Sequence, residues 1–158
     1  FVLSLLASAI YHLLPFDRTR ALLGRIDHAA IYFKIAGTYT PVALVGLGGG
    51  WGIALVTASW VIALIGVAMK LVWFDRAEKL GFILYIAQGW LCLAAIGPIV
   101  AALPFAAMVL LVIGGVVYTM GTYFYHKALP YARAIWHGHV LAAAVTHYAA
   151  VLMVLRIP

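Results

Sequence analysis

Two histidines, an aspartate and a serine lie in or beside stretches that are otherwise apolar: His12, His137, Asp27 and Ser8. Two imidazoles and a carboxylate are the protein ligands of a common type of catalytic zinc site, which keeps one position open for water. Ser8 precedes His12 by four residues, so in a helix it lies one turn away on the same face. These residue types suggest metal-assisted hydrolysis, provided that the fold brings them together.

The composition restricts the chain to one broad class. Of 158 residues, 67% are hydrophobic and 9% are charged, against about 45–50% and 25% in a soluble domain. The mean hydropathy is +1.12. These values exclude a soluble globular domain, a disordered chain and a secreted disulfide scaffold, and the single cysteine, Cys92, excludes an intrachain disulfide.

Six apolar stretches predict an all-α, polytopic transmembrane bundle. A helix needs about 20 apolar residues to cross the hydrocarbon core, and runs that are apolar on all sides are typical of helices rather than of barrel strands. The predicted stretches are 1–14, 28–47, 51–73, 81–100, 105–125 and 135–156. Because the chain opens on Phe1 inside such a stretch, we expect residues 1–158 to be a single transmembrane domain, a fragment that begins inside a helix. If one helix is missing upstream, the intact protein has seven spans.

The basic residues predict the orientation of the bundle. Most of them lie in or beside the first, third and fifth connections, the second and fourth connections carry no charge, and Arg156 departs from this pattern. Those in or beside the three connections are Arg18, Arg20, Arg25, Lys70, Arg76, Lys79, Lys127 and Arg133. By the positive-inside rule the odd-numbered connections are cytoplasmic, so the net charge of +6 reflects topology and does not indicate nucleic-acid binding.

This topology gives three candidate residues a similar depth in the membrane. His12 ends the first visible helix, Asp27 begins the second, and His137 lies one turn into the last, all on the cytoplasmic side. Each also has a structural interpretation, since a lone histidine near a helix end is often interfacial and Asp27 could cap its helix. Ionisable groups within spans are costly and by default mark functional sites. The shared depth of the three residues strengthens this functional interpretation beside the structural one.

Two further patterns are better explained by packing. His147 lies ten residues beyond His137, and we predict that its side chain makes a hydrogen bond to a neighbouring helix. Gly114, Gly115 and Gly121 predict a close approach of helix backbones, because small residues allow it in membranes.

Motifs along the whole chain are shared with a known family. They are Ser8-Ala9-Ile10-Tyr11-His12, Arg25-Ile26-Asp27-His28-Ala29-Ala30-Ile31-Tyr32, Ile35-Ala36-Gly37-Thr38-Tyr39-Thr40-Pro41, Gly89-Trp90, Gly114-Gly115-Val116-Val117-Tyr118-Thr119-Met120-Gly121, Ala134-Ile135-Trp136-His137 and Val140-Leu141 with His147. Together they resemble the bacterial hemolysin III proteins, a branch of the progestin and adipoQ receptor superfamily, which is related to the alkaline ceramidases.

The resemblance implies seven transmembrane helices and a zinc ion near the cytoplasmic face. On the family's pattern His12 and His137 are zinc ligands, Asp27 holds the zinc-bound water, and Ser8 lies close by. The family's remaining ligand is the first histidine of a His-x-x-x-His pair, and in this chain that position is Arg133.

Two arrangements are open at this departure. In the first, zinc is bound by His12, His137 and a directly coordinating Asp27, and Arg133 extends toward the interface on its long stem. In the second, no metal binds and Arg133 pairs with Asp27 as a buried ion pair. We favour the first arrangement. The margin is small, because a guanidinium close to Zn²⁺ would repel the ion.

Three hypotheses for function follow. The first is a zinc-dependent hydrolase in the cell's inner (plasma) membrane; relatives imply a membrane lipid amide as substrate, with Ser8 and Asp27 as catalytic residues. The second is a membrane receptor or lipid-homeostasis protein with a structural metal or none, and the family name also implies a cytolytic role. The third is a b-type cytochrome, in which two histidines from different helices would bind a haem. The different depths of His12 and His147 argue against it.

Overall fold

The computed structural model describes residues 2–13, 19–73, 78–125 and 130–156. These residues form α1 (Val2–Leu13), α2 (Arg20–Pro41), α3 (Gly49–Val72), α4 (Glu78–Gly89), α5 (Ile96–Ala102), α6 (Phe105–Tyr125) and α7 (Ala132–Leu155). α2 continues as a π-helical segment, Val42–Leu47, and a 3₁₀ segment, Leu91–Ala95, connects α4 to α5. No strand occurs in the described ranges, and the predicted all-α class is confirmed.

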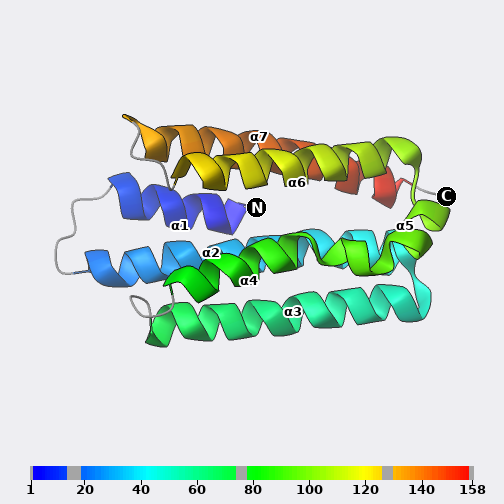
Figure 1. Ribbon diagram of the computed structural model, residues 1–158, viewed down its shortest axis with the longest axis horizontal. Helices are drawn as coiled ribbons and strands as arrows, with labels where there is room; N and C mark the ends of the chain where they lie inside the picture. Colours follow the sequence, from blue (N-terminus) through cyan, green and yellow to red (C-terminus); the bar gives the residue numbers. More distant parts are fainter. Residues whose placement is uncertain (1, 14–18, 74–77, 126–129, 157–158) are drawn as a thin grey trace.

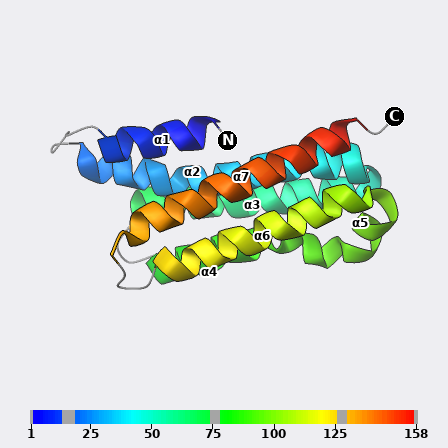
Figure 2. The same cartoon turned by 90° about the horizontal axis from the view of Figure 1, so that it is seen from above.

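Among the described residues, five helical segments are long and apolar enough to cross a membrane. They are Arg20–Leu47, Gly49–Val72, Lys79–Ala102, Phe105–Tyr125 and Ala132–Leu155. α1 has 12 residues, which cover about 18 Å at 1.5 Å per residue, less than the roughly 30 Å of a hydrocarbon core. It packs beside α2 and runs along the bundle with the other helices (Figures 1 and 2). The chain is therefore a multi-pass membrane protein.

Helix α2 begins earlier than the sequence indicated. It starts at Arg20 instead of residue 28, since Ala21, Leu22 and Leu23 are strong helix formers that extend it. The predicted connection 15–27 is thus wrong from residue 20 onward. Thr19 occupies the N-cap position, and Asp27 lies about two turns inside α2, so the interpretation of Asp27 as a cap is also wrong.

The fourth predicted stretch, 81–100, is interrupted where α4 ends at Gly89. The Tyr39 hydroxyl of α2 bridges the interruption: it donates to the Gly89 carbonyl oxygen at 3.1 Å and accepts from the Cys92 backbone N–H at 2.8 Å. Backbone polar groups in a membrane must be satisfied within the protein. The break is tolerated because a side chain from a neighbouring helix replaces missing helical bonds.

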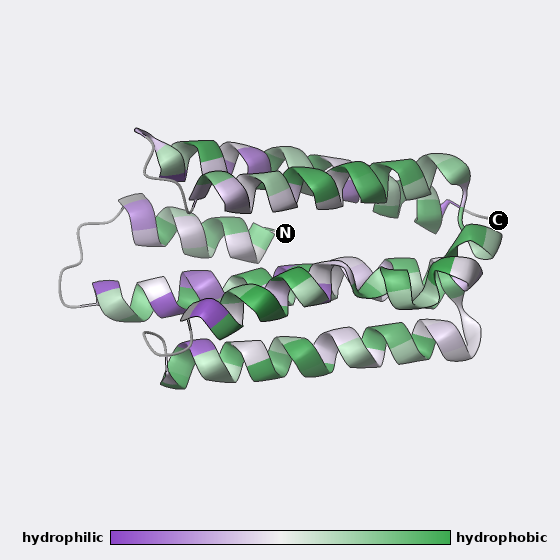
Figure 3. Cartoon of the chain, in the orientation of Figure 1, coloured by the Kyte–Doolittle hydropathy of each residue, from purple (hydrophilic) through white to green (hydrophobic). Residues whose placement is uncertain are grey.

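The two ends of the bundle differ in charge. One end is formed by the C-termini of α1, α3 and α6 and the N-termini of α2, α4 and α7 (Figure 1), and the hydropathy colouring concentrates polar residues there (Figure 3). We call it the basic end, because it carries Arg20, Arg25, Lys70, Lys79 and Arg133. Three more basic residues of the topology prediction, Arg18, Arg76 and Lys127, lie outside the described residues.

α6 and α7 lie side by side in both views (Figures 1 and 2) and pack closely. A Cβ at Gly114 would overlap the His147 ring, and a Cβ at Gly121 would lie 2.7 Å from the His139 Cβ. The predicted close approach is confirmed at Gly114 and Gly121, whereas a Cβ at Gly115 would make only an ordinary contact with the Trp90 ring, at 3.6 Å. Without a hydrophobic driving force between helices in lipid, such close contact is a main source of helix association.

Candidate metal centre and membrane cavity

The first and last described helices bring two histidines into contact at the basic end. His12 ends α1 and His137 lies near the start of α7, 125 residues later. Their Nε2 atoms are 3.3 Å apart, and the two rings meet edge to face with centroids 4.9 Å apart. This is the convergence that the sequence predicted from the shared depth of the two residues.

Asp27 of α2 completes the group. Its Oδ2 lies 3.9 Å from the His12 Nε2, and its side chain is 16% exposed, against 32% for His12. Asp27 therefore faces the histidine pair from a third helix. Among the described residues, however, no set of three or more histidine, cysteine, aspartate or glutamate side chains is close enough to form a complete metal site.

The distance between the two imidazole nitrogens fits two ligands of one zinc ion better than the distance from the Asp27 carboxylate to His12 does. Two ligand nitrogens on one tetrahedral zinc ion are about 3.3–3.4 Å apart, because each bond is near 2.0–2.1 Å. The His12–His137 separation of 3.3 Å has this value, and it also suits a hydrogen bond in which one Nε2–H donates to the other ring. Asp27, at 3.9 Å, is better placed to hold a water beside the ion than to be a ligand.

Arg133 lies at the edge of this group and is solvent-exposed. It lines a small pocket of about 100 Å³ together with His12, Asp27 and His137. Within the described residues the Asp27 carboxylate faces the His12 Nε2, and no Arg133 nitrogen lies within 4.0 Å of a carboxylate oxygen of Asp27. The Arg133–Asp27 pair of the metal-free arrangement is thus not formed in this structure.

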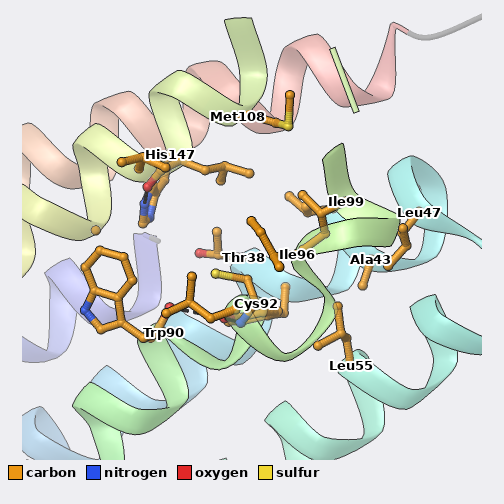
Figure 4. Close-up of a pocket in the computed structure, with 17 residues that line it drawn as sticks. Thr38, Ala43, Leu47, Leu55, Trp90, Cys92, Ile96, Ile99, Met108 and His147 are labelled. Atoms are coloured by element: carbon orange, nitrogen blue, oxygen red, sulfur yellow. Dashed lines mark hydrogen bonds between the residues drawn. The ribbon is translucent and has the colours of Figure 1, made fainter. Parts of the chain in front are cut away.

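A larger cavity of about 310 Å³ extends from Asp27 and His137 into the bundle. Ser8, Trp90 and His147 also line it. Trp90 and His147 line a neighbouring, apolar cavity of about 130 Å³ as well (Figure 4), which reaches past Ile99 and Leu47 toward the opposite end. The two cavities therefore adjoin, with Trp90 and His147 in the walls of both.

His147 has the structural role predicted for it. Its Nε2 donates to the Leu111 carbonyl oxygen of α6 at 3.1 Å, and its ring packs near Tyr118. This bond occupies the nitrogen that a haem iron would need. The prediction of a hydrogen bond across helices is confirmed.

Lys34 is a buried, cavity-lining residue that the sequence patterns above do not single out. It lies inside α2, is 7% exposed, and lines the 310 Å³ cavity. A lysine at the centre of a membrane helix costs about 2.5–3.5 kcal/mol on insertion scales. The signal was available, since position 34 is the one charged residue of the predicted stretch 28–47.

Comparisons with known proteins agree with this architecture. A family model described as "Haemolysin-III related" matches residues 1–148. The protein named "Hemolysin-3 homolog" of Bacillus subtilis (strain 168) is 39% identical over 148 residues, which are 93% of this chain and 70% of the relative. "Hemolysin-3" of Bacillus cereus is 36% identical over 148 residues, 93% of this chain and 68% of that protein. No solved structure matches at a significant level.

Proposed function

The chain belongs to the haemolysin III-related family, and on that premise we propose that it is a zinc-dependent hydrolase of lipid amides in the plasma membrane. The observation that carries the proposal is the 3.3 Å spacing of the His12 and His137 Nε2 atoms, which face each other beside a membrane cavity. The proposed ligands are these two imidazoles, and Asp27 would hold a water beside the ion.

Each residue has a chemical part in this proposal. When bound, zinc would polarise a carbonyl and lower the pKa of a bound water to about 7. His12 and His137 would present their Nε2 lone pairs, which requires both rings to be unprotonated there. The Asp27 carboxylate would accept the proton of the attacking water, and the Ser8 hydroxyl would donate to the developing oxyanion.

The cavities suggest the substrate class. The walls beyond Ser8 and His137 are mostly apolar, and the adjoining cavity in Figure 4 is lined by side chains such as Leu55, Ile99 and Met108. A molecule with a polar head at the histidine pair and an aliphatic chain in this path would satisfy both environments. An acylated amide, such as a ceramide-like lipid, has this form.

A second candidate function is a non-enzymatic membrane receptor or lipid-homeostasis protein. Arg133 favours it, because this residue lines the same pocket as His12, Asp27 and His137, and a positive charge near that pocket would repel a metal ion. The names of the two Bacillus relatives suggest that such a non-enzymatic membrane protein could have a cytolytic role.

Metal content and turnover together test the proposal. We expect purified protein to hold zinc near one equivalent, and His12→Ala and His137→Ala to lose it along with hydrolysis of a fluorescent ceramide. His139→Ala is the matched control, since His139 shares α7 with His137 but its Nδ1 bonds to the Ile135 carbonyl oxygen at 2.8 Å. Protein without zinc and without turnover would exclude the hydrolase, and zinc without turnover would favour the receptor.

A further inference from the structure

Arg25 of α2 lies outside the candidate metal centre and contacts a different helix. It precedes Asp27 by two residues, which turns its side chain about 200° around α2, away from the histidine pair. Its Nη1 donates to the Leu71 carbonyl oxygen, near the C-terminal end of α3, at 3.0 Å. Arg25 therefore lies where α2 and α3 meet at the basic end of the bundle.

The Arg25 guanidinium keeps most of its binding capacity after this contact. It carries five N–H donors in a rigid fork, and among the described residues its one acceptor is the Leu71 carbonyl oxygen, which is neutral. The whole chain has ten lysine and arginine residues against four aspartate and glutamate residues. The acidic residues are therefore too few to neutralise the basic end, and its remaining charge favours an anion from outside the chain.

Large apolar side chains lie beside Arg25 on the outer surface of both helices. On α2, Ile26 and Phe33 lie about 100° and 80° around the helix from Arg25 and are exposed. On α3, Leu71 is exposed as well, and the Trp60 ring lies 6.0 Å from the Phe33 ring further along the two helices. We call these five residues the α2–α3 seam: a cation at the basic end, followed by an apolar surface.

This order of charge and apolar surface matches a lipid of the surrounding bilayer. An arginine fork can bind a phosphate through two parallel N–H···O bonds, and basic sites between transmembrane helices bind the headgroups of anionic lipids. Trp73, which is exposed at the C-terminal end of α3, marks the headgroup level, since tryptophan is enriched at the membrane interface. Arg25 bonds to α3 only two residues before Trp73, so its guanidinium lies near that level.

We propose that the α2–α3 seam docks an anionic phospholipid from the leaflet at the basic end. Its phosphate binds the Arg25 guanidinium, and an acyl chain lies along the exposed apolar side chains of the seam. The proposal uses none of the internal cavities and needs neither zinc nor turnover, so it stands or falls independently of the hydrolytic function.

Native mass spectrometry of the detergent-solubilised full chain measures the affinity of each bound lipid. The first dioleoyl phosphatidylglycerol should bind about fivefold or more tightly than dioleoyl phosphatidylcholine, whose headgroup cation offsets the same phosphate. Inorganic phosphate at equal concentration should not displace the lipid, because it lacks the acyl chains. Equal affinity for the two lipids would overturn the proposal, and so would displacement by inorganic phosphate, which would indicate a site for small anions.

Two charge variants on the same helix assign the preference to Arg25. Arg25→Gln should remove the preference for phosphatidylglycerol, whereas Arg20→Gln should keep it. Arg20 is the matched control, since its replacement removes the same charge from α2 but at a position about 140° around the helix from Arg25. An unchanged preference in Arg25→Gln would overturn the proposal, and an equal loss in both variants would replace it with general attraction to the basic end.

A second pair of variants keeps Arg25 and its bond to Leu71 in place. Leu22 is exposed and lies three residues before Arg25 on α2, so a carboxylate there can pair with the guanidinium. Leu22→Glu should therefore weaken phosphatidylglycerol binding about fivefold, and Leu22→Gln, of the same size without the charge, should not. Unchanged binding in Leu22→Glu would overturn the proposal even if the Arg25→Gln protein failed to fold.

Discussion

The junction of α1, α2 and α7 at the basic end and the interface between α6 and α7 are built in different ways. The junction meets through polar side chains, with His12 contacting both His137 and Asp27, and these groups remain partly exposed. The α6–α7 interface instead depends on glycines that allow His147 and His139 to pack against the neighbouring backbone. The comparison separates a polar junction, on which the proposed chemistry depends, from a close-packed interface that holds two helices together.

The largest expected effect is all-or-none and concerns the side of the membrane on which the junction lies. In a Cys92→Ala background, Gly49→Cys should react with an impermeant maleimide from outside, and Arg20→Cys should not, because the basic end is expected in the cytoplasm. Labelling of intact cells and of lysed cells measures this. External labelling of Arg20→Cys would put the junction on the outer face.

Asp27→Asn should separate chemistry from stability at the junction. We expect hydrolysis to fall about 10²–10⁴-fold, because the amide cannot accept a proton from water, while zinc content stays near that of the parent. Turnover and metal analysis of the same preparation check both parts. Gly97→Ala, in α5 where a new Cβ meets nothing within 4 Å, is the control. Full activity of Asp27→Asn would exclude Asp27 as the base.

Gly114→Ala should show the opposite pattern at the α6–α7 interface. The new methyl group would overlap His147, and such overpacking typically costs about 1–3 kcal/mol of unfolding free energy. Gly37→Ala is the matched control, since a Cβ added there meets nothing within 4 Å and the alanine should stabilise the helix by up to about 1 kcal/mol. Thermal melts in detergent should therefore move in opposite directions.

Arg133→His should strengthen the junction by the smallest of these amounts. Positions 133 and 137 are one turn apart, about 40° around the helix, so both imidazoles can face one ion. Zinc affinity should rise on the order of tenfold, with a higher melting temperature when zinc is present, because the metal binds the folded state. Competition with a chromogenic chelator and thermal melts measure the two effects.

Arg133→Gln separates the new ligand from the lost charge in that experiment. It removes the guanidinium without supplying an imidazole, so any gain that it shares with Arg133→His comes from reduced repulsion. An Arg133→His protein that melts below the parent and gains nothing from zinc would contradict the metal-binding arrangement.

Much of the site could be predicted because its residue types are rare in their surroundings. His12, Asp27 and His137 were recognisable as costly polar groups in or beside apolar stretches, and the basic connections gave them one depth. Lys34 carried the same signal and was overlooked. The start of α2 at Arg20 is not visible in the apolar pattern, because Arg20, Arg25 and Asp27 interrupt it before residue 28, although arginine is itself a good helix former.

The amino-acid sequence by itself determined that this chain crosses the membrane repeatedly, which end is basic, and which family it resembles, since these properties depend on composition and local order. Only the tertiary structure decided that the His12 and His137 Nε2 atoms are 3.3 Å apart and that Arg133 forms no ion pair with Asp27. It also decided that the Lys34 Nζ lies over the Tyr118 ring. The reason is physical: each contact joins separate helices, and its length depends on how closely their backbones pack.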